Sequence, residues 1–157
     1  MTKEKKQEYT LRITQANKTT LVVILYEMLL FYIDEAIEMY EGANRKEFRL
    51  AIARTRNCLN ELMVSLNLEY EIAVRLLELY MFINKELARA EARADIVHLN
   101  NAAKIVKELH RTYREVSKND CSGAVMQNTQ AVYSGLTYDR GQAIDSLTNN
   151  VNRGYRA

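Results

Sequence analysis

The sequence predicts an all-α protein, an antiparallel up-down four-helix bundle with a partly ordered C-terminal tail. Its 157 residues include no proline and five glycines, a composition that suits long helices better than a turn-rich sandwich. Apolar residues recur at intervals of three and four over four stretches of similar length. The stretches are joined by short connections, which favour antiparallel neighbours in a bundle.

The composition divides the chain into three parts. Residues 1–16 form a polar N-terminal lead-in to which we assign no definite structure, and residues 17–118 carry the four helical stretches. Residues 119–157 form a C-terminal extension rich in Asn, Thr, Gln and Gly. The extension still carries more apolar residues than a disordered tail usually does, so we expect part of it to be ordered on the bundle.

The first long helix is the most apolar part of the chain. Asn17 is expected to cap its start, and Gly42 lies where a left-handed residue would end it. One face of the stretch Leu21–Tyr40 supplies an ordinary core stripe. Further apolar residues flank that stripe on both sides, namely Ile24, Met28 and Phe31 on one shoulder and Val23, Tyr26, Leu30 and Ile37 on the other. These shoulders need a cover, from this chain or from a partner.

The three later helices show narrower apolar stripes. Asn44, followed by Glu47, resembles a capping box at the start of the second, and Asp95 is expected to cap the fourth. The third stripe consists of Ile72, Ala73, Leu76, Leu79, Tyr80, Ile83, Leu87 and Ala90. Leu77, Met81 and Val74 lie to one side of it.

Charge and hydropathy exclude several classes of protein. The 22 basic and 20 acidic residues nearly balance and alternate along the helices, so a nucleic-acid partner is not expected. The longest apolar run, Leu21–Ile33, has 13 residues including Glu27, whereas a membrane span needs about 20. The N-terminus has no apolar core of a secretory signal. We therefore expect a soluble cytoplasmic protein without stable membrane insertion.

Catalytic and metal sites find no support in the sequence. A di-iron bundle needs two Glu-x-x-His pairs, whereas this chain has only His98 and His110, which we expect at exposed or rim positions. Cys58 falls on a core stripe, and Cys121 lies in the extension with no histidine near it. The nucleophile elbow, the CxxC pair and the glycine-rich phosphate loop are all missing. The sequence predicts no enzyme, cofactor or metal.

Binding through a helical surface remains. A groove lined by the shoulders of the first helix would suit an apolar helical segment of another protein, and Met28, Met63 and Met81 would adapt to it. The alternative is a non-catalytic bundle whose apolar surface packs against its own lead-in or tail, or closes a homo-oligomer.

A series of residues from Tyr9 to Val116 resembles the flagellar secretion chaperone family FliS. The series comprises Tyr9, Ile13, Ala16, Leu25–Tyr26, Ala36–Ile37, Glu61–Leu62, Ser65–Glu69, Ile72–Ala73, Leu76 and Leu79–Tyr80. The sequence departs from the family pattern at Lys18, where a proline is common, and at Glu27–Met28, where Asp-Gly is common.

The resemblance implies a cytoplasmic export chaperone. Such a protein binds the disordered C-terminal segment of flagellin in an apolar groove, prevents premature polymerisation and delivers flagellin to an export gate protein. It implies that Tyr9 and Ile13 cover the groove or dock on the export gate. For the client groove we predict Ile24, Met28, Phe31, Val23, Tyr26, Leu30, Leu77 and Met81. A further hypothesis places the apolar residues of Val125–Tyr138 in the groove as an intramolecular plug.

Overall fold

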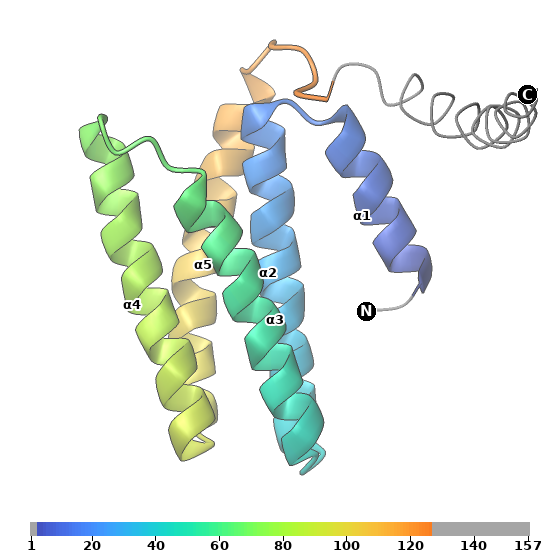
Figure 1. Ribbon diagram of the computed structural model, residues 1–157, viewed down its shortest axis with the longest axis vertical. Coiled ribbons are helices and arrows are strands. Elements are labelled where there is room, and N and C mark those ends of the chain that lie inside the picture. The colour runs from blue at the N-terminus through green and yellow to red at the C-terminus, as the bar shows by residue number, and fades with distance from the viewer. Residues whose placement is uncertain (1–2, 127–157) are drawn as a thin grey trace, which may run out of the picture.

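Five helices and short turns make up residues 3–126, the part of the chain that the computed structural model describes (Figure 1). The helices are α1 (Lys3–Gln15), α2 (Lys18–Glu41), α3 (Arg45–Val64), α4 (Glu71–Arg93) and α5 (Ile96–Lys118). No strand occurs within these residues. The predicted all-α class is confirmed, but the structure has one helix more than the sequence predicted.

The four long helices α2 to α5 surround one apolar core. The chain alternates in direction from each of these helices to the next (Figure 1), and α2 contacts α3 and α5, which both also contact α4. Consequently α2 and α4 lie diagonally across the core. The largest fully buried core side chains are Tyr26, Leu29, Ile33, Ile52, Leu59, Leu62, Tyr80, Ile83, Leu87 and Leu99.

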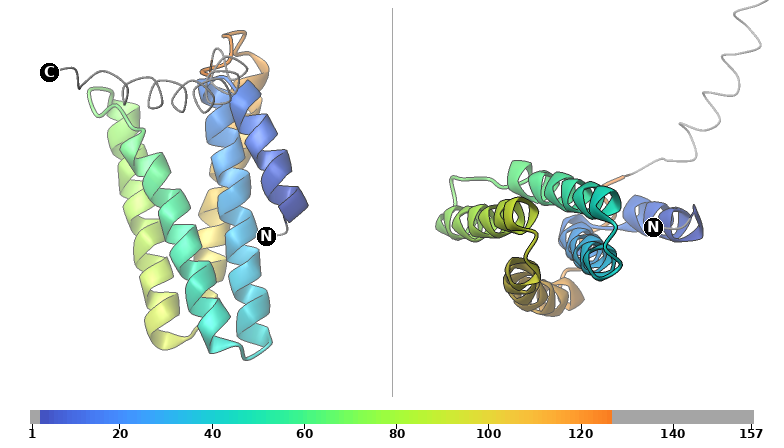
Figure 2. Two further views of the ribbon diagram at one scale, coloured as in Figure 1. Left: turned by 45° about the vertical axis from the view of Figure 1, so that its right-hand side comes forward. Right: turned by 90° about the horizontal axis from the view of Figure 1, so that it is seen from below.

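The extra helix is α1, which lies in the lead-in for which the sequence predicts no definite structure. It lies outside the other four helices, beside α2 (Figure 2). An isolated helix of 13 residues is marginal in water, so α1 owes its stability to packing against α2.

Three of the predicted helix starts are capped as expected. The Asn17 Oδ1 atom accepts a hydrogen bond from the Thr20 amide at 2.8 Å. The Asn44 side chain accepts from the Glu47 amide at 3.3 Å, and the Asp95 side chain accepts from the Val97 amide at 2.9 Å. Each cap satisfies a backbone donor that the first helical turn leaves unpaired.

The end of α2 differs from the prediction. Gly42 has an ordinary φ of −74°, and Ala43 takes the left-handed conformation with a φ of 53°. The Ala43 amide donates to the Tyr40 carbonyl and the Asn44 amide to the Met39 carbonyl, each at 3.0 Å. This is the Schellman arrangement, which needs its left-handed residue one position beyond the cap, so alanine and not glycine meets that requirement.

The outer flank of α4 also differs from the prediction. Ile72 and Leu79 were expected in the core stripe but are 65% and 38% exposed. The residues of α4 that face the core are centred on Ala73, Tyr80 and Leu87. Ile72 and Leu79 each precede one of these by a residue, a turn of about 100°, which leaves them on the edge of the stripe.

Candidate functional site

The shoulder of α2 that carries Ile24 is covered by α1. Tyr9 and Ala16, at two positions of the N-terminal segment seven residues apart, are buried with Ile24 in a small apolar cluster. Ile13, Leu21 and Met28 pack around it. We call this set the α1–α2 cluster. The buried residues of the larger core form a separate cluster, and Met28 packs against both. Removing α1 would therefore expose the α2 shoulder without uncovering the buried residues of the core.

Charged side chains frame the α1–α2 cluster. An Arg12 guanidinium nitrogen lies 2.6 Å from a Glu27 carboxylate oxygen, which joins α1 to α2 by an ion pair. This contact raises the pKa of Arg12. The Lys5 ammonium lies 4.3 Å from the centre of the Phe31 ring, a cation–π distance. Burial and the Glu27 charge raise the pKa of Tyr9.

The turn between α1 and α2 is fastened by the segment that follows α5. The Asn17 side-chain amide donates to the carbonyl oxygens of Asp120 and Ser122, at 3.1 and 3.3 Å. The Val125 amide donates to the Ala16 carbonyl at 2.9 Å. We call residues 119–126 the strap. It joins the segment after α5 to the turn between α1 and α2.

The strap bears on the plug hypothesis for Val125–Tyr138. Val125 and Met126 are about half exposed, and the backbone of Val125 bonds to the α1–α2 turn. Asp120 accepts a hydrogen bond from the Thr19 hydroxyl, and its pKa is lowered to about 2, chiefly by its hydrogen bonds with Ser122 and then with Thr19. Residues 127–138 of the hypothesised plug lie outside the described residues.

The predicted groove residues are not all on one surface. Ile24 and Met28 lie in the α1–α2 cluster, and Phe31 lies under Lys5 of α1. Val23 is buried, and Leu30 packs against the core. Tyr26 is fully buried, with its hydroxyl oxygen 2.5 Å from that of Tyr80. Its position on the wheel suggested a shoulder, but the aromatic side chain reaches inward and finds a hydrogen-bond partner on the diagonal helix.

Leu77 and Met81 are separated from the α2 shoulder by the bundle itself. Both belong to α4, the helix diagonal to α2, where Leu77 is half-buried and Met81 is 59% exposed. Tyr9 and Ile13, the predicted cover, do lie on α2. Tyr9 and Ile13 thus lie in one cluster with Ile24 and Met28, Lys5 lies over Phe31, and Leu77 and Met81 lie on another helix.

A second apolar depression, between α4 and α5, was not predicted. It has a volume of about 630 Å³ and is lined by Leu79, Phe82, Asn101, Lys104, Ile105, Glu108, Leu109 and Thr112. Phe82 is 43% exposed, and contact of so much aromatic surface with water is energetically unfavourable. The sequence contained little indication of this depression. Leu79 fits the helical period of the core residues, and Phe82 is a single apolar residue outside that period.

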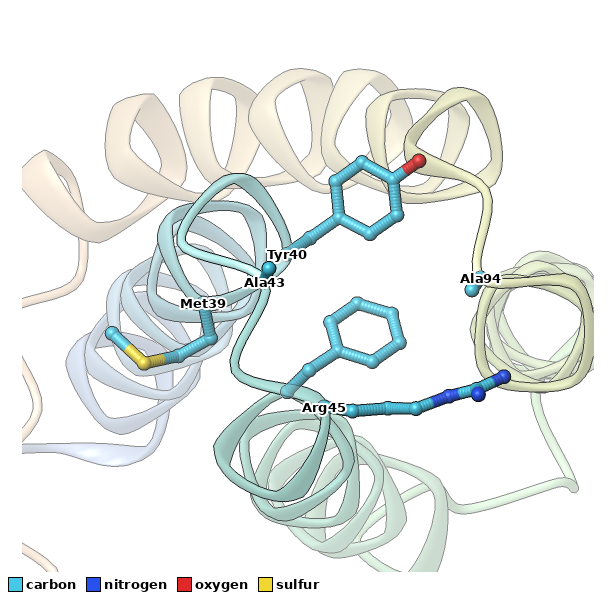
Figure 3. A pocket seen from close by; sticks show the side chains of 6 residues that line it. Met39, Tyr40, Ala43, Arg45 and Ala94 are labelled. Carbon is cyan, nitrogen blue, oxygen red and sulfur yellow. The ribbon is translucent and has the colours of Figure 1, made fainter.

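A smaller cavity of about 350 Å³ lies where the α2–α3 and α4–α5 turns meet (Figure 3). Its lining includes Tyr40, Phe48 and Arg45, together with Ala43 and Ala94. Figure 3 shows the Arg45 side chain extending toward Ala94. Both alanines have a positive φ, 53° and 50°, so this cavity is bounded by the two strained turns of the described chain.

The two histidines are half-buried and face carboxylates, whereas the sequence placed them at exposed or rim positions. His98 Nδ1 lies 2.9 Å from a carboxylate oxygen of Glu86, which is buried in α4 and also accepts from Asn101 and Arg89. The hydrogen bond to His98, followed by those to Asn101 and Arg89, lowers the pKa of Glu86 to about 2. This network joins α4 to α5.

Comparison with known protein families shows the family to which the chain belongs. The family described as Flagellar protein FliS matches residues 1–120, which include all five helices. The chain belongs to the FliS family. No curated protein matches the sequence. Residues 121–157, which make up most of the C-terminal extension, lie beyond the FliS match.

Membership in FliS implies a flagellar export chaperone and gives no support to a catalytic role. Within residues 3–126 we find no group of three or more His, Cys, Asp or Glu side chains that could hold a metal ion. Among the described helices, none is long and apolar enough to cross a membrane. The α1–α2 cluster and the α4–α5 depression are two apolar features of the described residues outside the main core.

Proposed function

We propose that this FliS-family chain binds the disordered C-terminal segment of flagellin in the cytoplasm, prevents its premature polymerisation and delivers it to the flagellar export gate. The observation that carries the proposal is the separate α1–α2 cluster. A largely polar helix covers Ile24, Met28 and Phe31 and buries little of the main core. A client helix with a larger apolar face can replace it.

The energetics agree with exchange of α1 for a client. Burying one large apolar side chain contributes about 1.5–3 kcal/mol, so several contacts offset the cost of ordering a disordered segment. α1 contributes only Tyr9 and Ile13 to this cluster, and Ala16 follows directly after the helix. The covered state is therefore weakly held, which permits loading of the client and its later release.

Calorimetry with a synthetic flagellin C-terminal peptide and the full chain tests this proposal. We expect micromolar or tighter binding, with at least a tenfold loss, about 1.4 kcal/mol, in the Met28→Asp variant because the charge would lie in the apolar shoulder. The matched control is Val97→Ser, at an exposed position on α5, which should bind like the parent. Absence of binding at tens of micromolar, or an equal loss in both variants, would refute the proposal.

Docking on the export gate is assigned to the apolar side of α1, which packs on α2 in this structure. Once a client occupies the α2 shoulder, Tyr9 and Ile13 lose their cover and become free for a second partner. This order of events links cargo loading to delivery. A pull-down with the export gate protein should then be stronger with the flagellin peptide present, and weaker for the Tyr9→Ser chain.

Self-association is the second candidate function. The exposed side chains of Leu79, Met81 and Phe82 favour it, because exposed apolar surface of this kind is often buried in the interface of an oligomer. Light scattering at low micromolar concentration distinguishes the two functions. A persistent dimer that binds no flagellin peptide would replace the chaperone proposal.

A further inference from the structure

The carboxylate of Glu27 lies beneath α1 and depends on α1 for its counter-charge. Its side chain is 27% exposed, and one oxygen lies 2.6 Å from the Arg12 guanidinium. The other oxygen lies 3.6 Å from His110 Nε2 of α5, which exceeds a hydrogen-bond distance. When α1 leaves, Glu27 therefore loses its closest cation among the described residues.

α1 displays the pattern of side chains that this surface accepts. Tyr9, Arg12 and Ile13 of α1, and Ala16 directly after its end, follow one another at intervals of three, one and three residues, and the first three share one helical face. Tyr9 and Ala16 are buried, Ile13 packs beside them, and Arg12 reaches Glu27 from the same face. The segment that occupies this surface thus presents an aromatic, a basic, an aliphatic and a small residue at fixed intervals.

A replacement helix that covers the same shoulder would bury Glu27 further. A half-buried carboxylate that loses its ion-pair partner and is then shielded from water is strongly destabilising, whereas a new cation in the same register restores the pair. An apolar segment without a basic residue at that position therefore competes poorly with α1, however well its other side chains fit.

We propose that Glu27 selects the client: the segment that replaces α1 is an amphipathic helix with Arg or Lys three residues after a large aromatic or aliphatic residue, an aliphatic residue next, and a small residue three positions later. This inference rests on the proposed function, since the segment selected is the export client. It adds the register and the charge by which the client is recognised.

The test uses a peptide copy of α1 and a chain whose own α1 is detached. The probe is the labelled peptide KEKKQEYTLRITQA, which corresponds to residues 3–16. The receptor is the full chain with Ile13→Asp, and the comparison peptide carries Arg12→Gln. We expect the parent peptide to bind at least about fivefold more tightly than the comparison peptide, because a charge-assisted hydrogen bond is lost.

The matched receptor carries Glu27→Gln in addition to Ile13→Asp. On this receptor the two peptides should bind within a factor of about two, because the selecting charge is absent. A Glu27→Lys receptor should reverse the preference and favour a peptide with Arg12→Glu. Equal binding of the first two peptides to the Glu27 receptor, unchanged discrimination on the Gln receptor, or no binding of the parent peptide would overturn the inference.

Hydrogen exchange on the otherwise unmodified chain supplies a second readout that needs no peptide. Arg12→Gln and Glu27→Gln should each speed exchange of the α1 amides, and the double variant should exchange no faster than either single one. If the double variant exchanged faster than either single variant, with additive effects, the proposed pairing of Arg12 with Glu27 would be contradicted.

A flagellin C-terminal peptide measured in parallel separates this inference from the proposed function. Equal binding of that peptide to the Glu27 and Gln receptors would leave the export function intact and refute selection by Glu27. Discrimination between the α1 peptides, combined with no flagellin binding, would support the selective surface and refute flagellin as its client.

Discussion

Tyr26 and Tyr80 place a polar contact in the middle of the core. Their hydroxyl oxygens lie 2.5 Å apart, on helices that face each other diagonally, and both side chains are almost completely buried. Burial raises the pKa of Tyr80 to about 12, so the pair stays neutral at physiological pH. Since a buried hydroxyl is costly without a partner, the pair fixes the height of α2 relative to α4.

Tyr80→Phe should lower the free energy of unfolding by about 1–3 kcal/mol, because the Tyr26 hydroxyl is left without its partner. Tyr26→Phe should have a similar effect. The double variant should be less destabilised than the sum of the two single variants. Urea unfolding followed by circular dichroism measures all four proteins, and strict additivity would show that the hydroxyl groups do not stabilise each other.

The left-handed alanines provide a second test at the residue scale. Ala94 ends α4 with a φ of 50°, a conformation that costs an L-residue about 1–2 kcal/mol and glycine almost nothing. Ala94→Gly should raise the free energy of unfolding by roughly 0.5–1 kcal/mol once the entropy of the unfolded glycine is subtracted. Ala92→Gly, two residues earlier in the helix, is the control and should lower it by about 1 kcal/mol.

At the scale of elements, a buried ionic network joins α4 to α5. Glu86 is 2% exposed and accepts hydrogen bonds from three side chains, including His98. Its pKa is lowered from 4.5 in the unfolded chain to about 2 in the fold. The network therefore stabilises the fold above the unfolded pKa, and this contribution is lost as the pH falls from about 4.5 to about 2.

Glu86→Gln should destabilise the protein near neutral pH and make its stability less dependent on pH in that acid range. The measurement is the free energy of unfolding at several pH values for both proteins, and the difference between them isolates Glu86 from the other carboxylates. A parallel pair of curves from pH 4.5 down to pH 2 would contradict the assigned role.

The junction of α1, α2 and the strap depends on one asparagine. Asn17 caps α2 and donates to two carbonyls of the strap. Asn17→Ala should lower stability by about 1–2 kcal/mol and speed exchange of the Thr20 amide. Asn60→Ala, on the exposed face of α3, is the matched control and should change little.

At the scale of the whole molecule, two apolar clusters of unequal size share α2. The large one holds α2 to α5 together, and the small one holds α1. With this division α1 can leave the α2 shoulder while α2 to α5 stay packed, because α1 lies outside the main core.

Detaching α1 should therefore leave the bundle intact. Ile13→Asp should lower the global free energy of unfolding by less than about 1 kcal/mol, yet remove the exchange protection of the α1 amides and increase binding of a hydrophobic dye. Unfolding of the whole chain by this substitution would show that α1 is part of the main core.

Local patterns in the sequence were sufficient for much of the fold. The sequence predicted the helical class, the four long helices and the caps Asn17, Asn44 and Asp95. Hydrophobic periodicity and helix capping both depend on residues only a few positions apart. The surplus of apolar residues on α2 indicated a covered surface for the same reason. The FliS resemblance is confirmed over residues 1–120, whereas the role it implied for Tyr9 and Ile13, as a groove cover or in docking on the export gate, stays a prediction.

Only the tertiary structure decided which helix covers which. It made a helix of the polar lead-in, turned Tyr26 inward toward Tyr80, and left Leu79 and Phe82 exposed beside α5. It also brought Glu27 to Arg12 and the strap to Asn17. A helical period gives the direction of a side chain about its own axis, whereas burial depends on the neighbours that packing places there. Those contacts join residues far apart in the chain, so no local pattern records them.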